Sequence, residues 1–360
     1  MNKFLITGGA GFIGSNFVHY WQRKYPEDVI IVMDSLTYAG NKNNLEFCSD
    51  QLNFKFVKGS VCDEALVEKV FIENEINRVV HFAAESHVDR SITEPNAFIS
   101  TNIIGTHTLL KVAKDLWLDD KLSDHLFHHV STDEVYGSLG NRDPAFKETS
   151  RYAPNSPYAA SKAASDHLVR AYFHTYGLKV TTSNCSNNYG PYHFPEKLIP
   201  LCLINILNGD ELPIYGNGKQ IRDWLYVIDH CRGIELVLQK GSHGETYNIG
   251  GNNEWANIDV VCLLCDVVNE KFRLSPDLAV RFPNSPCAKS EDAKSLIAYV
   301  QDRPGHDVRY AIDATKITEQ LGYKPAINFE DGLKKTIDWY LDNENWWKAI
   351  LDRSYREDFF

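Results

Sequence analysis

Two groups of residues near the middle of the chain could carry out chemistry together. The run Ser131-Thr132-Asp133-Glu134 places two adjacent carboxyl groups after an apolar stretch, and Tyr158 and Lys162 follow, four residues apart. Residues four apart on a helix share one face, so Tyr158 and Lys162 can act on the same hydroxyl. Tyr158 could take a hydroxyl proton while hydride leaves, if a cation favours its phenolate, and the two carboxyls could serve as acid and base. A site holding both groups could oxidise a sugar, eliminate water from it and reduce it again.

The two carboxyl groups need opposite protonation states for such a reaction. Asp133 would be protonated to act as the acid, whereas Glu134 would be ionised to act as the base. Neighbouring carboxyls in a shielded site can have their pKa values pushed apart in this way. A bare Asp-Glu pair is more often two solvated loop charges. The position directly after Ser131-Thr132, at the end of an expected strand, favours the catalytic interpretation.

The elements that must position these residues follow a β/α alternation in the first half of the chain. Apolar runs predict strands at residues 4–6, 29–33, 53–57, 78–82, 127–130 and 178–182. Helices are predicted between them, among them residues 13–25, 102–117 and 159–176, the last ending at Gly177. Buried strands separated by helices indicate an α/β fold with a Rossmann-type, doubly wound parallel sheet. Ligands of such sheets bind at the carboxyl ends of the strands, where the polar residues fall.

The local residue pattern changes after about residue 185, where Pro, Gly and Asn become frequent. We expect residues 1–185 to form a nucleotide-binding domain and residues 186–360 to form mainly a smaller α/β substrate-binding domain. Segments near residues 224–250 are expected to return to the first domain, because the run 247–250 resembles a further strand. The C-terminal run from Trp339 to Phe360 reads as an amphipathic helix and tail, with no role beyond packing.

A glycine-rich loop follows the first predicted strand and opens the first predicted helix. Gly8, Gly11 and Gly14 allow a tight turn, close approach of the backbone to a pyrophosphate and close helix packing. The helix N-terminus would face the phosphate charge. Asp34 ends the next strand, twenty residues after Gly14, and can bind a ribose 2′-hydroxyl while repelling a 2′-phosphate. The loop therefore predicts NAD rather than NADP as the cofactor.

The net charge, the apolar stretches and the cysteines limit the classes of function that this chain can have. The 360 residues carry a formal net charge of −11, which argues against general binding of nucleic acids or anionic membranes. No stretch approaches the ~18 apolar residues of a membrane span, and we expect a cytoplasmic protein. The eight cysteines are scattered and are expected to be reduced thiols. Cys262 and Cys265 form a CxxC without a second ligand pair, so no metal site is predicted.

The combination of the glycine loop, the segment Ala83 to Asp89 and the Tyr158/Lys162 pair resembles the extended short-chain dehydrogenase/reductase superfamily. Within it, the chain resembles the dTDP-glucose 4,6-dehydratase family over essentially its whole length. Longer segments carry this closer resemblance: 36–41, 131–137, 184–200 and 302–307.

The resemblance implies a reaction in three steps on a sugar nucleotide, dTDP-glucose. Tyr158, with Lys162, would deprotonate the sugar C4 hydroxyl while hydride passes to NAD. Glu134 would then remove the C5 proton and Asp133 would protonate the departing C6 hydroxyl, with Thr132 placing the C4 oxygen. Return of the hydride to C6 would give the 4-keto-6-deoxy sugar and regenerate NAD.

The resemblance also implies two sets of binding residues. The set expected to bind NAD, besides Tyr158 and Lys162, is Gly8, Gly11, Phe12, Ile13, Gly14, Asp34, Ser35, Leu36, Thr37, Ser60, Val61, Phe82, Ala83, Ala84, Ser86, Thr101 and Asn188. The set expected to bind substrate is Ser86, Thr132, Asn187, Glu196, Lys197, Pro213, Tyr215, Arg222, Asn257, Arg303 and His306. Arg222 and Arg303 would face the diphosphate. Ser60 departs from the family pattern, in which Asp accepts from the adenine amino group.

Other interpretations stay open at this point. A UDP-sugar 4-epimerase shares the glycine loop and the Tyr/Lys pair but needs no acid–base carboxyl pair, and a UDP-glucuronate decarboxylase is a further relative. A non-catalytic NAD sensor would be expected to have lost a catalytic residue. Superfamily members commonly dimerise through two helices that correspond to residues 102–117 and 159–176, so a homodimer is expected.

Overall fold

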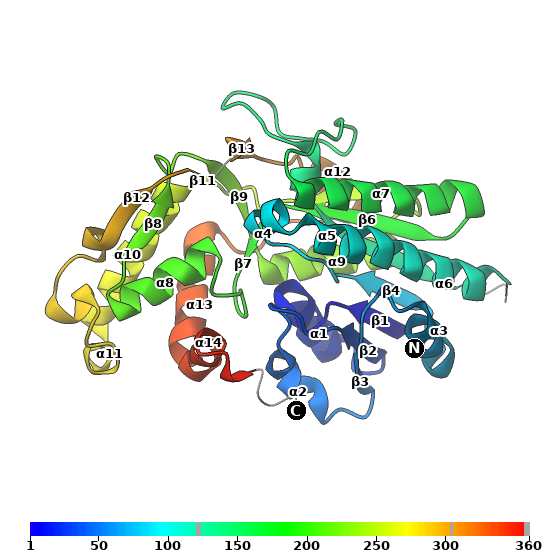
Figure 1. Ribbon diagram of the computed structural model, residues 1–360, viewed down its shortest axis with the longest axis horizontal. Helices are drawn as coiled ribbons and strands as arrows, with labels where there is room; N and C mark the ends of the chain where they lie inside the picture. The colour runs from blue at the N-terminus through cyan, green and yellow to red at the C-terminus, as the bar shows by residue number, and fades with distance from the viewer. Residues whose placement is uncertain (120–123, 303–304, 356–360) are drawn as a thin grey trace.

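A computed structural model describes residues 1–119, 124–302 and 305–355, and its largest element is a seven-stranded parallel sheet (Figure 1). Across the sheet the order is β10 (Thr246–Ile249), β6 (Val180–Cys185), β5 (Leu126–Thr132), β4 (Arg78–His81), β1 (Lys3–Thr7), β2 (Val29–Asp34) and β3 (Phe54–Lys58). The order reverses between β1 and β4, whose carboxyl ends therefore flank a topological switch point, where ligands of such sheets bind. The predicted doubly wound parallel sheet is confirmed.

Helices cover both faces of this sheet because its strands are apolar on both sides. Along β1, Phe4 and Ile6 pack in one cluster with Phe17 of α1 (Phe12–Lys24) and Ile234 of α9 (Val227–Lys240). Leu5 points to the opposite face, as the two-residue period of a strand requires. There it joins residues of α3 (Glu64–Asn74), α6 (Thr106–Asp119) and α7 (Pro157–Tyr176).

Helix α7, which carries Tyr158 and Lys162, has well-defined ends. The Ser156 hydroxyl accepts a hydrogen bond from the Ala159 N–H at 3.1 Å, and Pro157 takes the first helical position. Gly177 ends the helix with φ +76°, a left-handed conformation that suits glycine. The helix predicted at 102–117 instead consists of a π-helix, Ile99–Gly105, followed by α6.

Most of the second half of the chain forms a smaller α/β lobe beside the sheet (Figure 1). Its strands are β7 (Asn187–Tyr189), β8 (Leu212–Tyr215), β9 (Ile221–Tyr226), β11 (Glu254–Ala256), β12 (Ile297–Val300) and β13 (Arg309–Tyr310). Its helices are α8 (Leu198–Asn208), α10 (Asn257–Leu274), α11 (Asp277–Arg281), α13 (Phe329–Asp342) and α14 (Glu344–Leu351). Their apolar faces share one core, which includes Leu203, Leu264 and Phe329.

The first half also contains the short helices α2 (Glu46–Ser49), α4 (Val88–Thr93) and α5 (Pro95–Phe98). In the second half, α12 (Thr315–Leu321) packs near β10 and α9. Strand β10 pairs with β6, so residues 246–249 lie in the large sheet although they follow the first strands of the smaller lobe. The two lobes therefore share the chain rather than dividing it at one point.

The eight cysteines are all free thiols, and Cys262 and Cys265 both lie in α10. Within the described part of the chain, no group of three or more His, Cys, Asp or Glu side chains is arranged to hold a metal ion. No helix among these described residues has both the length and the apolar character needed to cross a membrane.

Candidate active site

A cavity of about 510 Å³ lies at the carboxyl ends of the sheet strands, between the sheet and the smaller lobe. It is lined by residues that follow β1, β2, β4, β5 and β6 and by residues of β8, β9 and α10. The cavity brings together every site residue predicted from the sequence except Leu36, Ser60 and Arg303. Arg303 falls outside the described residues.

The glycine loop lies at the floor of this cavity and has no room for side chains. Gly8 has φ +69°, and a Cβ there would lie 2.6 Å from the backbone nitrogen of Ala83. A Cβ on Gly14 would lie 2.3 Å from the carbonyl oxygen of Gly8. Gly11 caps the N-terminus of α1, whose free N–H groups face the loop. The backbone therefore forms a cradle that fits a pyrophosphate.

Asp34 is held in a fixed orientation at the end of β2. Its carboxylate accepts hydrogen bonds from the Ala10 N–H at 3.0 Å and the Leu36 N–H at 2.8 Å. Burial raises its pKa, while these two hydrogen bonds favour the ionised form. The oxygens keep lone pairs for a ligand hydroxyl. These acceptor oxygens thus fit the ribose hydroxyls of a dinucleotide without a 2′-phosphate.

Two residues predicted to contact the cofactor are placed differently from the rest. Leu36 has φ +53° and donates its N–H to Asp34, so its backbone shapes the loop, but its atoms are not among those that line the cavity. Ser60 is exposed, and its hydroxyl accepts from the Cys62 N–H at 3.2 Å. Gly59 and Val61 on either side of Ser60 do line the cavity.

The acidic pair lies where β5 ends and a 3₁₀ turn, Asp133–Tyr136, begins. The Thr132 hydroxyl caps this turn by accepting from the Glu134 N–H at 3.3 Å. Asp133 is 2% exposed, and its Oδ2 has no hydrogen-bond partner among the described residues. Burial, first of all, and the nearby Glu134 carboxylate raise the pKa of Asp133 well above its ordinary value. Asp133 is therefore a carboxyl group that stays protonated when an exposed carboxyl is ionised.

Tyr158 and Lys162 lie on the same side of α7, facing the end of β5. Tyr158 is 8% exposed and Lys162 is 4% exposed, and the Lys162 ammonium donates to the Val130 carbonyl at 2.9 Å. Burial raises the pKa of Tyr158 well above its ordinary value, the Glu134 carboxylate adds to this, and a hydrogen bond with Thr132 opposes it. Because burial and Glu134 both disfavour the phenolate, the proposed role of Tyr158 as a base requires a further cation in the cavity.

A buried carboxyl group, Asp166, interacts electrostatically with Lys162. It follows Lys162 by one helical turn and accepts from His129 Nε2 at 3.1 Å and from the Tyr152 hydroxyl at 2.9 Å. Burial raises the pKa of Asp166 to about 6, and Lys162 opposes that rise. Burial lowers the pKa of Lys162, and Asp166 opposes that change. Each charge thus helps to keep the other ionised inside the protein.

The opposite wall of the cavity comes from the smaller lobe and carries most of the predicted substrate residues, whereas Ser86 and Thr132 lie on the sheet side. Arg222 of β9 is 5% exposed, donates to the Asp307 carbonyl at 3.0 Å and lies over the Tyr310 ring, 4.3 Å from its centroid. Tyr215 of β8 is 44% exposed and packs edge-on against His306. The wall therefore offers a cation and two aromatic rings next to each other, as an aromatic base with a diphosphate would require.

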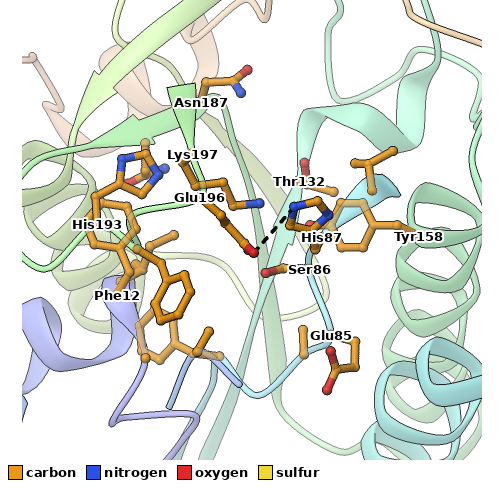
Figure 2. A pocket seen from close by; sticks show the side chains of 18 of the residues that line it. Phe12, Glu85, Ser86, His87, Thr132, Tyr158, Asn187, His193, Glu196 and Lys197 are labelled. Atoms are coloured by element: carbon orange, nitrogen blue, oxygen red, sulfur yellow. Dashed lines mark ion pairs between the residues drawn. The ribbon is translucent and has the colours of Figure 1, made fainter. Parts of the chain in front are cut away.

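Several polar side chains lie between the two walls (Figure 2). Figure 2 shows His87 on the same side as Thr132 and Tyr158. Glu196 and Lys197 lie across from them, and Ser86 lies near Glu196. His87 Nε2 and Glu196 Oε2 lie 3.5 Å apart. Among the described residues, Glu196 Oε1 and Asn187 Oδ1 are buried without a hydrogen-bond partner. These free acceptors fit the hydroxyl groups of a sugar.

Several lining residues were not singled out from the sequence: Tyr38, Glu85, His87, His193, Phe194 and Tyr310. Five of them fall inside segments whose resemblance to the family was noted (36–41, 83–89 and 184–200), so a signal for them existed. Tyr310 had no such signal. It reaches the cavity because the short strand β13 pairs with β9 beside Arg222.

The fold and the site together define a Rossmann-type enzyme of the short-chain dehydrogenase/reductase class. The chain belongs to the family described as GDP-mannose 4,6 dehydratase, whose model matches residues 5–336.

Two relatives show how close this match is. The chain is 53% identical over 359 residues to the dTDP-glucose 4,6-dehydratase of Neisseria meningitidis serogroup B, covering 99% of this chain and 98% of that protein. The solved structure of DesIV, the dTDP-glucose 4,6-dehydratase of Streptomyces venezuelae, contains NAD. It matches with a TM-score of 0.86 at 45% identity and covers 97% of this chain and 99% of that one.

A third relative performs a different reaction on a similar scaffold. The UDP-glucose 4-epimerase of Thermotoga maritima matches with a TM-score of 0.79 at 29% identity, covering 95% of this chain and 99% of that one. The fold alone therefore does not separate a dehydratase from an epimerase. The residues of the site must make that distinction.

Proposed function

We propose that this protein converts dTDP-glucose to dTDP-4-keto-6-deoxyglucose with NAD as its bound cofactor. The observation that carries the proposal is the buried Asp133, next to Glu134, in the cavity that also holds Tyr158 and Lys162. An epimerase needs the Tyr/Lys pair alone, whereas a dehydratase also needs an acid and a base to eliminate water. The similarity to the Neisseria enzyme supports the same substrate.

The cofactor, when bound, supplies hydride chemistry and the positive charge of its nicotinamide ring. The glycine cradle would hold its pyrophosphate, and Asp34 would hold a ribose hydroxyl. A positive charge beside the Tyr158 phenol favours the phenolate and offsets the effect of burial on its pKa. Tyr158 then takes the proton of the sugar C4 hydroxyl, with Thr132 hydrogen-bonded near the same oxygen.

Elimination of water is assigned to the carboxyl pair. The 4-keto group acidifies the C5 proton, which Glu134 removes as a base. Asp133, kept protonated by burial and by its neighbour, delivers a proton to the departing C6 hydroxyl, which leaves as water. Return of hydride to C6 and of a proton to C5 completes the product and leaves the cofactor oxidised, so NAD can stay bound through the cycle.

The substrate is assigned to the wall built by the smaller lobe. Arg222 would pair with the diphosphate, together with Arg303, and Lys197, Asn257 and His306 would bind in the same region. Pro213 and Tyr215 would line the base pocket, while Ser86, Asn187 and Glu196 would bind the sugar. The large sheet, with its returning segment near 224–250, would thus serve the cofactor, and residues 186–360 would mainly serve the substrate.

We also propose that the protein works as a homodimer in the cytoplasm. Eight unpaired cysteines suit a reducing compartment. Ile99 and Ile104, just before α6, and Tyr176, at the end of α7, are each about half exposed. Exposed apolar groups on adjacent helices favour an interface there. Light scattering should give the mass of two chains, and a monomer at working concentration would contradict the dimer.

The activity is tested by incubating the protein with dTDP-glucose and measuring the alkali-induced absorbance of a 4-keto sugar. Formation of the 4-keto-6-deoxy product supports the proposal. Interconversion of UDP-glucose and UDP-galactose without that product would identify an epimerase, and NAD binding without turnover of either substrate would identify a sensor.

A further inference from the structure

The C-terminal helix and tail make contacts that packing within the smaller lobe does not explain. We define the C-terminal strap as α14 and the residues after it up to Tyr355. It lies beyond the residues 5–336 that match the family model. The expected single amphipathic helix is divided, because α13 ends at Asp342 and α14 begins at Glu344. This break turns the strap from the smaller lobe toward the cofactor side of the cavity.

The first contact of the strap leads to the glycine loop. Trp346 Nε1 donates a hydrogen bond to Asn44 Oδ1 at 2.7 Å, although 302 residues separate the two. Asn44 is 2% exposed, and its amide Nδ2 donates to the Ala10 carbonyl at 2.9 Å. Because the indole N–H requires the amide oxygen, the amide NH₂ must point toward Ala10. Ala10 in turn donates its N–H to Asp34, so Trp346 stands at the end of a hydrogen-bonded chain that reaches the ribose carboxylate.

The second contact leads to the loop that follows Asp34. The hydroxyl of Tyr355 donates to the Tyr38 carbonyl at 2.7 Å, and Tyr355 is 4% exposed. Tyr38 lines the cavity together with Ser35, Thr37, Ala39 and Gly40. The strap thus holds both backbone segments that we assign to NAD, the glycine loop through Asn44 and the 35–40 loop through Tyr355.

The other end of the strap is fixed in the smaller lobe. Trp347 is 1% exposed and donates its indole N–H to the Tyr340 carbonyl at 3.0 Å. Trp346 packs edge-on against Trp339 of α13, with ring centroids 4.9 Å apart. Both tryptophans therefore pack on the smaller lobe, but Trp346 also reaches Asn44 on the cofactor side through its indole N–H.

We propose that Trp346 and Tyr355 are positioning residues for NAD and that the strap slows its release. A loop already fixed in its bound shape loses less entropy when a ligand binds, and the effect falls mainly on dissociation. Retention suits an enzyme that regenerates its cofactor in every turnover. The inference rests on the proposed NAD binding but does not depend on the proposed dehydration.

The test compares Trp346→Phe, Tyr355→Phe and the double variant with the matched control Trp347→Phe. Each of the two positioning substitutions keeps an aromatic ring and removes one hydrogen bond. NAD dissociation is followed by chase with labelled NAD, and hydrogen exchange of residues 35–44 is followed in the protein stripped of NAD. We expect each single variant to release NAD about fivefold faster, and the double variant more than tenfold faster, from the loss of one or two hydrogen bonds. Exchange in residues 35–44 should rise in the same order.

The control separates positioning from general packing. Trp347→Phe loses an equivalent indole hydrogen bond on the same helix, so it should lower the thermal midpoint while leaving NAD release unchanged. Wild-type NAD release in the double variant, or equal acceleration by Trp347→Phe, would overturn the proposal. The two single variants lie at separate contacts, so either one carries the test if the double variant does not fold. Faster exchange in the stripped protein supports the strap even if no dehydration is found.

Discussion

The two walls of the cavity differ in how their side chains are held. On the sheet wall, Asp133, Tyr158 and Lys162 are all less than a tenth exposed, and they stand on a strand end and a capped helix. On the wall of the smaller lobe, Tyr215 is 44% exposed, and Glu196 and His306 are intermediate. Asp133, Tyr158 and Lys162 are therefore fixed and desolvated before substrate arrives, while Glu134, the base assigned to C5, is intermediate. Most groups assigned to recognition keep contact with water, although Arg222 is buried.

This difference predicts where substitutions act. Changes on the sheet wall should lower kcat, because buried groups there stabilise charge that develops during reaction. Changes on the substrate wall should raise KM, because they remove contacts made before reaction as well as during it.

Tyr158→Phe should give the largest effect. Removing the phenol hydroxyl removes the base for the C4 hydroxyl, and turnover should fall by about 10²- to 10⁴-fold. Reduced nicotinamide should not form when dTDP-glucose is added, while the amount of bound NAD stays at the wild-type level. Rapid formation of reduced nicotinamide in this variant would show that another group deprotonates the C4 oxygen.

Arg222→Gln should give the next largest effect, which should fall on KM rather than on kcat. Loss of a charge-assisted contact of about 1.5–3 kcal/mol should raise KM for dTDP-glucose by about 10- to 100-fold, with NAD retention unchanged. The matched control is Arg309→Gln on the neighbouring strand. Arg309 pairs with Glu254 at 2.6 Å and does not line the cavity, so its loss should leave KM unaltered. An unchanged KM in Arg222→Gln would remove this residue from the substrate site.

Asp166→Asn should change how stability depends on pH. The pKa of Asp166 is raised to about 6 in the folded protein, above its ordinary value of 3.8. Folding thus favours the protonated carboxyl group. The stability that protonated Asp166 contributes is fully present below pH 3.8 and is lost as the pH rises through about 6. Relative to wild type, the variant should gain about 3 kcal/mol in unfolding free energy between about pH 4 and pH 7. Parallel stability curves from denaturant titrations at several pH values would contradict this.

Ser60→Asp should give the smallest effect. A carboxylate beside Val61 would offer a charged acceptor to the adenine amino group and tighten NAD binding by a few-fold. Ser60→Ala is the control, and it should change the affinity little, because Ser60 is exposed. Weaker NAD binding by the Asp variant, measured by calorimetry on stripped protein, would show that adenine lies elsewhere.

The sheet wall was the easier part to predict from the sequence. Its strands are apolar runs, and Gly8, Gly14 and Asp34 occupy positions that only a nucleotide-binding turn requires. The spacing of Tyr158 and Lys162 fixes their common face without any tertiary information. The burial of Asp133 could be proposed from its position after a strand, but its extent depends on the packing of distant elements and needs the folded structure.

The remaining features depend on contacts between distant segments. Tyr310 reaches the cavity through a two-residue strand, which gives no periodic pattern. Asp166 looks like any polar residue on a helix until His129 and Tyr152 are placed against it. The contacts of Trp346 and Tyr355 each span more than 300 residues, so local patterning predicted a helix and a tail but no partner.

The central claim is the division of labour between Tyr158 and the carboxyl pair. Asp133→Asn combined with Glu134→Gln, mixed rapidly with dTDP-glucose, tests it most directly. We predict that reduced nicotinamide appears and persists, because Tyr158 still supports oxidation at C4, while no 4-keto-6-deoxy sugar forms. Formation of that product at the wild-type rate would contradict the assignment of water elimination to Asp133 and Glu134.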